Sequence, residues 1–344
     1  MDSRPSLSSE GKIFHIPDTL EKWPWPARIS PHIDVVKADL AALMKGYPKL
    51  EPKALKMLAY ADSELFTCCV YPGLNEAQLG VVIAFCPLGW LVDEAVEELL
   101  DPRGTAAVPN IIMDVLRDPF KDRPLEEHPV GEIARQWWLR VVKEMTPVAV
   151  KRLSDATEKW LLFNTLQTKL SLSCVDETIE DYLERRNIDV CMLVCMVFAE
   201  MGDADIPQEV WEHTTLETVR SLMCNIILLD NDMFSYNKEQ ARGDYHNSLH
   251  IMMRDQHLDL DGAFRWAVER HWALQEEYLK TLAKMPSWGL EIDSKVDRYI
   301  GGLGRIISGN ITYSVLCRRY ADGREMIGPH NNRVFELLPS YKPV

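Results

Sequence analysis

Three residues that can supply oxygen ligands recur at four-residue intervals: Asn231, Ser235 and Glu239. Because an α-helix completes a turn about every 3.6 residues, an amide, a hydroxyl and a carboxylate at this spacing share one helical face. Oxygen ligands suit a hard cation such as Mg²⁺ better than zinc or copper. Lys238 lies beside this stripe, and a cation next to a metal site usually binds an anion such as phosphate. The spacing therefore predicts a magnesium site that binds a diphosphate.

A polar stripe on a helix is most often its solvated face, but the residues before this stripe argue against that alternative. Residues 219–230 read VRSLMCNIILLD, so an apolar helix leads directly into the polar stripe, which favours an interior site. A calcium-binding EF-hand loop beginning at Asp230 is a second alternative. It fails because Ser235 stands where the loop needs a turn glycine and Ala241 where it needs a bidentate glutamate.

Composition restricts the class of protein. With 344 residues, the chain is long enough for one large domain or two ordinary ones, and its 47% hydrophobic residues indicate a globular protein. A net charge of −14 argues against a nucleic-acid partner or binding to an anionic membrane. The eight cysteines lack zinc-ligand spacing and lie mostly in apolar runs, as in a reducing compartment. Without an apolar leader or a membrane-length apolar run, the chain is predicted to be cytoplasmic, with no membrane span.

Helical patterns dominate the chain between two irregular ends. Residues 1–35 are punctuated by prolines and are predicted to form an irregular strap, and residues 322–344 a C-terminal tail. Apolar residues recur at helical spacing within 36–46, 53–70, 76–101, 107–119, 127–145, 147–173, 177–186, 189–201, 207–239, 246–255, 260–284 and 290–321. Pro87 should kink one of these helices or begin a new one. Strand-type alternation is nearly absent, so the prediction is a single all-α domain over residues 36–321.

A second acidic segment also follows an apolar helix. Asp93 and Glu97 are one turn apart, with Glu94 between them. Two carboxylates on one helical face repel unless a cation lies between them, although a solvated acidic face is the ordinary alternative. Together with the stripe from Asn231 to Glu239, this segment would hold Mg²⁺ against one diphosphate.

Two pairs of arginines could bind the same anion. One pair is Arg185 and Arg186, and the other is Arg318 and Arg319, which Tyr320 follows. The guanidinium group matches phosphate oxygens bidentately, but paired arginines on their own are more often surface residues that promote solubility.

In these motifs the chain resembles the class I terpene cyclases of the single-domain microbial and fungal type. The motifs occur in the family's order, and the spacing from Arg185 to Asn231 also matches. The resemblance implies metal ligation by Asp93, Asn231, Ser235 and Glu239, with Glu94 and Glu97 as acidic acceptors behind them; diphosphate binding by Arg185, Lys238, Arg319 and Tyr320; and catalytic roles for Arg185 and Tyr320. It further implies about three Mg²⁺ ions.

The chain departs from the family pattern at three points. Glu94 follows Asp93 where family members commonly carry consecutive aspartates, and Tyr313 stands where many have tryptophan. After Arg185, the segment with Ile188 and Asp189 replaces the usual threonine and glycine.

The resemblance implies a helical bundle around a central apolar cavity, in which a linear prenyl diphosphate is ionised and cyclised to a hydrocarbon or alcohol with release of diphosphate. The single-domain length fits the fifteen-carbon farnesyl diphosphate best, and ten- and twenty-carbon substrates remain open. Aromatic faces can stabilise a carbocation in such a cavity. The candidates, each of which could equally be ordinary core, are Phe66, Phe85, Trp90, Phe163, Phe198 and Tyr313. A homodimer is also implied.

Three other functions compete with this interpretation. A trans-prenyltransferase shares the fold, the Mg²⁺ and the diphosphate but resembles its relatives in two aspartate-rich motifs, whereas the second motif here is of the Asn/Ser/Glu type. A protonation-initiated cyclase needs an Asp-x-Asp-Asp acid, and the nearest match, from Asp259 to Gly262, fails at its last position. A non-catalytic helical remnant that binds diphosphate is the third alternative.

Overall fold

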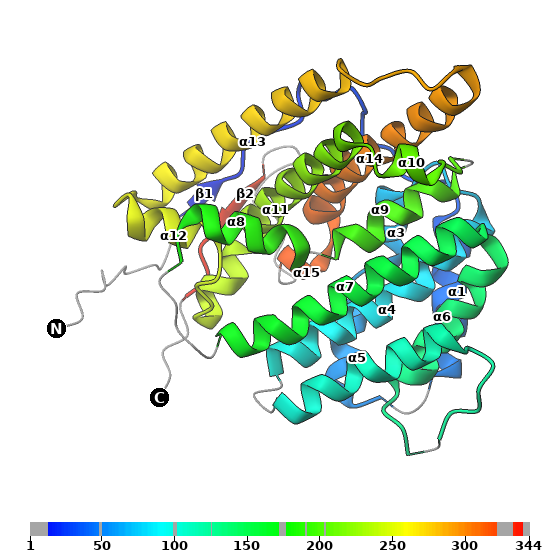
Figure 1. The fold of residues 1–344 in the computed structure, drawn as a ribbon. Coiled ribbons are helices and arrows are strands. Elements are labelled where there is room, and N and C mark those ends of the chain that lie inside the picture. The colour runs from blue at the N-terminus through cyan, green and yellow to red at the C-terminus, as the bar shows by residue number, and fades with distance from the viewer. Residues whose placement is uncertain are drawn as a thin grey trace.

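The computed structural model describes residues 13–47, 50–98, 102–124, 126–171, 177–189, 191–202, 204–321 and 333–339, apart from the side chains of 93–98, 102–106, 165–171, 187–189 and 321. Helices form most of this part of the chain, so the predicted all-α class is confirmed (Figure 1). In chain order the elements are β1 (Ile13–His15), α1 (Ile33–Gly46), α2 (Pro52–Tyr60), α3 (Ser63–Val70), α4 (Glu76–Glu98), α5 (Pro102–Arg117), α6 (Val130–Glu144), α7 (Pro147–Ser171), α8 (Ile179–Asp189), α9 (Met192–Phe198), the 3₁₀ helix η1 (Ala199–Met201), α10 (Gln208–Trp211), α11 (Thr214–Arg242), α12 (Ser248–Asp255), α13 (Leu260–Leu282), α14 (Leu290–Leu316), α15 (Arg318–Ala321) and β2 (Val334–Glu336).

Several helices differ from the sequence pattern, and the expected ranges 53–70, 207–239 and 290–321 are each divided in two. The single helix expected over residues 53–70 is broken at Asp62, which adopts the left-handed conformation with φ 44° and separates α2 from α3. The Asp62 carboxylate accepts hydrogen bonds from the backbone N–H of Arg318 at 2.7 Å and from its Nε at 2.9 Å. In contrast, α4 continues through Pro87 and does not restart there.

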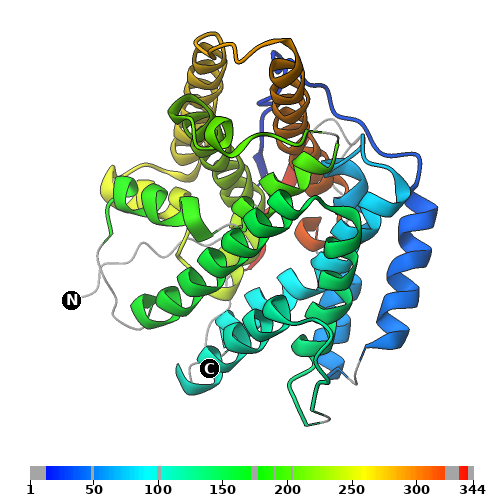
Figure 2. The ribbon, with the colours of Figure 1, turned by 45° about the vertical axis from the view of Figure 1, so that its right-hand side comes forward.

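The long helices pack against one another in pairs to form the bundle. Helix α11 packs on α13 and α14, α4 packs on α6 and α1, and α3 packs on α14. The last contact is close because α14 carries a glycine there: a Cβ on Gly309 would lie 2.2 Å from the carbonyl oxygen of Cys69. Helices α1 and α13 lie on opposite flanks of the bundle (Figure 2).

An aromatic cluster fills part of the core. The ring of Phe85 lies 5.0 Å from that of Trp137, 5.8 Å from that of Trp160 and 5.5 Å from that of Phe198. Phe198 and both tryptophans are fully buried. Burial of such large rings contributes strongly to stability, and it joins α4, α6, α7 and α9.

The two ends of the described chain meet in a small antiparallel sheet. Strand β1 pairs with β2, with Phe14 opposite Phe335. The Phe14 ring stacks on those of Phe335 at 5.4 Å and Phe264 at 5.1 Å, which fastens the sheet to α13. In the described part of the expected strap, residues 13–35, β1 and the start of α1 at Ile33 are regular, and the residues between them form no helix or strand.

The described part of the chain has no helix that is long and apolar enough to cross a membrane. Its cysteines are free, and all but Cys191 are buried: Cys68, Cys69, Cys86, Cys195, Cys224 and Cys317. Cys174 lies outside the described residues.

Candidate metal and diphosphate site

The predicted stripe lies on the second half of α11. This helix begins at a His213 cap, whose Nδ1 accepts from the N–H of Thr215, and ends at Gly243, whose φ of 77° suits glycine. Ser235 is only 4% exposed, and in the described part of the chain its hydroxyl forms no hydrogen bond of normal geometry, although it lies near enough to Glu239 to lower the pKa of that carboxyl. A buried hydroxyl without a partner is costly, because nothing replaces its hydration. The stripe therefore presents an oxygen that a ligand could satisfy.

Glu239 is held from the neighbouring helix. Asn247, which is fully buried, donates from Nδ2 to Glu239 Oε2 at 2.9 Å and to the carbonyl oxygen of Asp232 at 2.9 Å. Burial, and to a smaller degree the Asp232 carboxylate, raise the pKa of Glu239 to about 7, even though the nearby amide of Asn247 and hydroxyl of Ser235 oppose the rise. The carboxylate thus lacks a sufficient counter-charge, which a divalent cation would provide.

The Asp232 carboxylate joins three helices. Its carboxylate accepts from the Tyr182 hydroxyl at 2.9 and 3.0 Å and from the N–H of Ser248 at 3.0 Å. Burial raises the pKa of Asp232, and the guanidinium of Arg186 partly opposes that rise. We infer that Asp232 positions α8 and α12 against α11 rather than binding metal.

The two neighbouring arginines of α8 have different partners. The guanidinium of Arg185 forms an ion pair with Glu177, with Nε to Oε1 at 2.6 Å, and contacts His246 Nε2 at 2.5 Å. Arg186 instead directs Nη2 toward Asn231 Oδ1 at 3.5 Å. Burial and both guanidinium groups lower the pKa of His246 to about 3, so this imidazole is neutral. The sequence singled out Arg185, yet Arg186 lies nearer the stripe.

Tyr320 lies beside the first residue of the stripe. Its hydroxyl accepts from Asn231 Nδ2 at 3.1 Å, and burial raises its pKa to about 12, so the hydroxyl stays protonated. The adjacent Arg319 stacks on the ring of Trp90, with Cζ 4.5 Å from the ring centre. Lys238, the other predicted diphosphate ligand, is half-buried on α11.

The first acidic motif lies near the end of α4. Asp93, Glu94 and Glu97 are helical, but their side chains lie outside the described part of the structure, so their roles stay predictions. Among the described residues no three His, Cys, Asp or Glu side chains form a metal site.

The predicted cavity aromatics fall into two groups. Phe66, Trp90 and Tyr313 form one cluster: the Phe66 ring is 6.3 Å from that of Trp90 and 5.2 Å from that of Tyr313. The Tyr313 hydroxyl donates to the carbonyl oxygen of Ala61 at 2.6 Å, which fixes this ring. Phe85 and Phe198 belong to the aromatic core, and Phe163 is half-buried on α7, so their roles as cavity walls stay predictions.

Sequence reasoning missed three residues that shape this site. Asn247 and Tyr182 hold Glu239 and Asp232, and Glu177 binds Arg185. A signal existed for Asn247, since asparagine directly before a helical pattern indicates an N-cap, and its Oδ1 accepts from the N–H of Leu249 at 2.9 Å. Tyr182 is 50 residues from its partner Asp232, and Glu177 is separated from Arg185 by a turn of chain before α8, so neither pair gave a helical-spacing signal.

The chain is similar to known proteins over most of its length. The family model "Terpene synthase family 2, C-terminal metal binding" matches residues 84–277. The chain is 31% identical to Δ6-protoilludene synthase 18 of Postia placenta, over 95% of this chain and 93% of the relative. It is 32% identical to a Δ6-protoilludene synthase of Stereum hirsutum, over 96% and 94%. The solved structure of linalool/nerolidol synthase from Streptomyces clavuligerus, in complex with 2-fluorogeranyl diphosphate, superposes with a TM-score of 0.73 at 18% identity, over 87% of this chain and 99% of that one.

Proposed function

From the premise that the chain belongs to the terpene synthase family, a family of lyases, we propose that it ionises and cyclises farnesyl diphosphate with Mg²⁺. The observation that carries this proposal is the stripe on α11, where the buried hydroxyl of Ser235 lacks a partner among the described residues and Glu239 lacks a counter-charge. Asn231, Ser235 and Glu239, together with Asp93 of α4, would hold the metal. When bound, Mg²⁺ supplies the positive charge that stabilises a departing diphosphate.

The cations around the stripe would bind the same diphosphate. Arg186 is already directed toward Asn231, and the protonated hydroxyl of Tyr320 can donate to an anion. Arg185 is bound by Glu177, so its contact with a diphosphate requires exchange of that carboxylate for the phosphate oxygens. Lys238 and Arg319 complete the set. These groups would neutralise the leaving group as the allylic carbon–oxygen bond breaks.

The reaction also requires a dry, apolar environment, because water would capture the carbocation at once. Phe66, Trp90 and Tyr313 lie beside Tyr320, and the rings of Tyr313 and Tyr320 are 6.5 Å apart. This apolar cluster would exclude water from one side of the diphosphate.

The names of the relatives support a fifteen-carbon substrate. Protoilludenes are sesquiterpenes, and a further relative in Postia placenta is named sesquiterpene synthase 9. A cytoplasmic location and a homodimer belong to the same proposal, and light scattering on the purified protein tests the homodimer.

The test is to incubate the purified protein with the ten-, fifteen- and twenty-carbon linear prenyl diphosphates separately, with Mg²⁺ or with excess chelator, and to analyse the extract by gas chromatography and mass spectrometry. A chelator-sensitive cyclic product from the fifteen-carbon substrate is expected. Longer prenyl diphosphates formed after addition of isopentenyl diphosphate would indicate a prenyltransferase. Absence of product with all three substrates would indicate a non-catalytic remnant.

Variants test the metal assignment. Asn231→Ala and Glu239→Ala should each abolish turnover while circular dichroism shows a folded protein. Glu269→Gln removes an exposed carboxylate from α13 and is the matched control, with normal turnover expected. Normal product formation by a folded Glu239→Ala protein would overturn the assignment.

A further inference from the structure

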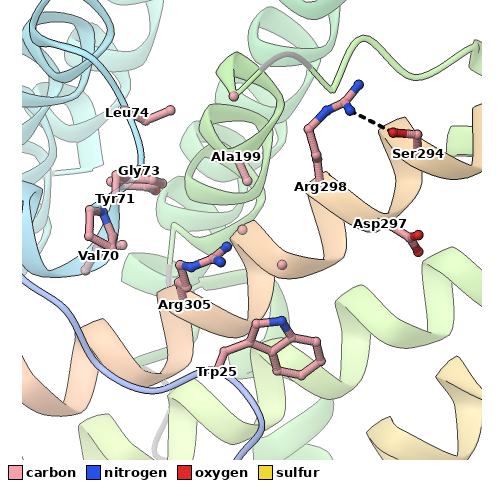
Figure 3. A pocket seen from close by; sticks show the side chains of 14 residues that line it. Trp25, Val70, Tyr71, Gly73, Leu74, Ala199, Ser294, Asp297, Arg298 and Arg305 are labelled. Carbon is pink, nitrogen blue, oxygen red and sulfur yellow. Dashed lines mark hydrogen bonds between the residues drawn. The ribbon is translucent and has the colours of Figure 1, made fainter. Parts of the chain in front are cut away.

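A second cavity lies at the opposite end of the bundle from the stripe. It has a volume of about 460 Å³, and its walls are residues 70–74 between α3 and α4, the segment around η1 and the first half of α14 (Figure 3). We call it the base pocket. It lies near the start of α4, whereas Asp93 lies 17 residues beyond Glu76 on that helix, or about 25 Å at 1.5 Å per residue. Helix α14 indicates the same separation between the base pocket and the stripe, because residues in its first half line the pocket and its C-terminal end leads to Tyr320.

Two glycines form the floor of the base pocket. Gly301 and Gly302 lie on the same face of α14 as Arg298 and Arg305, because positions three, four and seven residues apart share a helical face. A Cβ on Gly301 would lie 3.0 Å from Nη1 of Arg305, and one on Gly302 would lie 3.1 Å from the Cβ of Ala199. The missing side chains therefore let the end of Arg305 and the side chain of Ala199 lie close against the backbone of α14.

Two guanidinium groups flank this floor. Arg305 is half-buried, and its side chain makes no hydrogen bond or ion pair with any residue that the structure describes. Arg298 donates from Nη1 to the Ser294 hydroxyl at 2.8 Å (Figure 3). Asp297 also lines the pocket and lies four residues before Gly301 on the same face of α14, so one carboxylate accompanies the two guanidinium groups. The balance of these three charges is positive, in a protein whose net charge is −14.

The remaining walls suit a small organic anion. Trp25 lies beside Arg305, and Val70 and Leu74 add apolar surface opposite α14 (Figure 3). A volume of 460 Å³ falls within the range typical of small-molecule sites. Guanidinium groups bind phosphate oxygens bidentately and are preferred over lysine for that purpose.

We propose that the base pocket binds a diphosphate group without metal, between Arg298 and Arg305 and over the glycine floor. The diphosphate could be free inorganic diphosphate or the head of a prenyl chain that packs on Trp25. This site is separate from the proposed reaction, and it requires neither Mg²⁺ nor turnover.

Equilibrium dialysis of the full chain with radiolabelled inorganic diphosphate in excess chelator tests the proposal, because the chelator removes metal-dependent binding at the stripe. Loss of a charge-assisted contact in Arg305→Gln or Arg298→Gln should weaken binding about tenfold or more. Arg270→Gln, which removes an exposed arginine from α13, is the matched control, and binding by it and by Asn231→Ala should be unchanged.

The non-reactive farnesyl thiolodiphosphate then distinguishes the two sources. Displacement of the label by this analogue at lower concentration than by unlabelled diphosphate indicates a prenyl ligand, and the reverse order indicates free diphosphate. The proposal would be overturned if no diphosphate binds in the presence of chelator at millimolar concentration. It would also be overturned if the Asn231→Ala variant loses this binding while the Arg305→Gln variant keeps it. Turnover is not measured, so failure here is distinct from failure of the proposed reaction.

Discussion

Replacement of Trp90 by leucine should weaken diphosphate binding at the proposed active site. Trp90 was predicted from the sequence as an aromatic face for a carbocation, but the structure shows the guanidinium of Arg319 over that ring at 4.5 Å. The indole Nε1 donates to the Ser63 hydroxyl at 3.0 Å, which fixes the plane of the ring. We therefore expect Trp90 to act as a positioning residue that aims Arg319.

The magnitude follows from the stacking geometry. A cation–π contact at a half-buried site contributes about 1 kcal/mol, so its loss corresponds to about a fivefold weaker affinity. The assay is competitive inhibition by inorganic diphosphate during turnover with Mg²⁺, which reports on the active site alone. Trp90→Leu should raise the inhibition constant about fivefold. Trp90→Phe keeps an aromatic face and loses only the bond to Ser63, so it should raise the constant less.

A carbocation role for Trp90 predicts a different pattern. In that case Trp90→Leu would change the ratio of cyclic products and lower kcat, while the inhibition constant of diphosphate stayed the same. That result would refute the reasoning from the Arg319 contact.

Four further outcomes are expected. The pKa of Glu239 is raised to about 7, chiefly by burial, and Mg²⁺ must displace the proton that this carboxyl holds below that pH. Calorimetry should therefore find that Mg²⁺ binds about tenfold more tightly at pH 8 than at pH 6. A Mg²⁺ affinity that does not depend on pH would contradict this expectation. The raised pKa also means that the metal-free protein loses stability as pH rises from about 4.5 toward 7. Tyr182→Phe removes a hydrogen bond to the buried carboxylate of Asp232 and should lower the free energy of unfolding by about 2 kcal/mol, measured by urea denaturation; an unchanged midpoint would show that Asp232 has another partner. Gly309→Ala would place a Cβ 2.2 Å from the Cys69 carbonyl oxygen and force α14 away from α3. It should lower the free energy of unfolding by about 3 kcal/mol, measured by urea denaturation. A free energy of unfolding equal to that of the wild type would exclude this packing of α14 on α3.

Local sequence signals predicted the helices well because helical periodicity is a property of neighbouring residues. They failed where a distant contact decides the backbone. Asp62 interrupts the pattern over residues 53–70, and it is bound by Arg318, which lies at the other end of the chain. The pairing of β1 with β2 likewise depends on both ends of the chain meeting, and three residues are too few to show alternation.

The same division holds for the candidate site. The residues on one face of α11 could be identified from their spacing, since a single helix sets it. The different partners of Arg185 and Arg186 could not, because adjacent helical residues point about 100° apart and only the surrounding helices decide which one faces Asn231. The stacking of Arg319 on Trp90 joins α15 to α4 and has no local signal either.

The second half of α11 also shows why its polar residues are not a solvated face. Asn237, which is 6% exposed, donates from Nδ2 to the carbonyl oxygen of Glu336 at 2.9 Å and accepts from the N–H of Leu338 at 2.8 Å. Gln240 donates to the Leu338 carbonyl oxygen at 2.8 Å. Polar groups on this face are therefore satisfied by the chain end that follows β2, because a buried amide needs partners. Along the stripe, Ser235 is buried and Asn231 and Glu239 are half-buried. Asn231 and Glu239 have hydrogen-bond partners in the protein, but the described chain leaves the Ser235 hydroxyl without a hydrogen bond. The face that carries Asn237 and Gln240 is thus satisfied by the protein itself, whereas the stripe keeps a buried hydroxyl that a bound ion would satisfy.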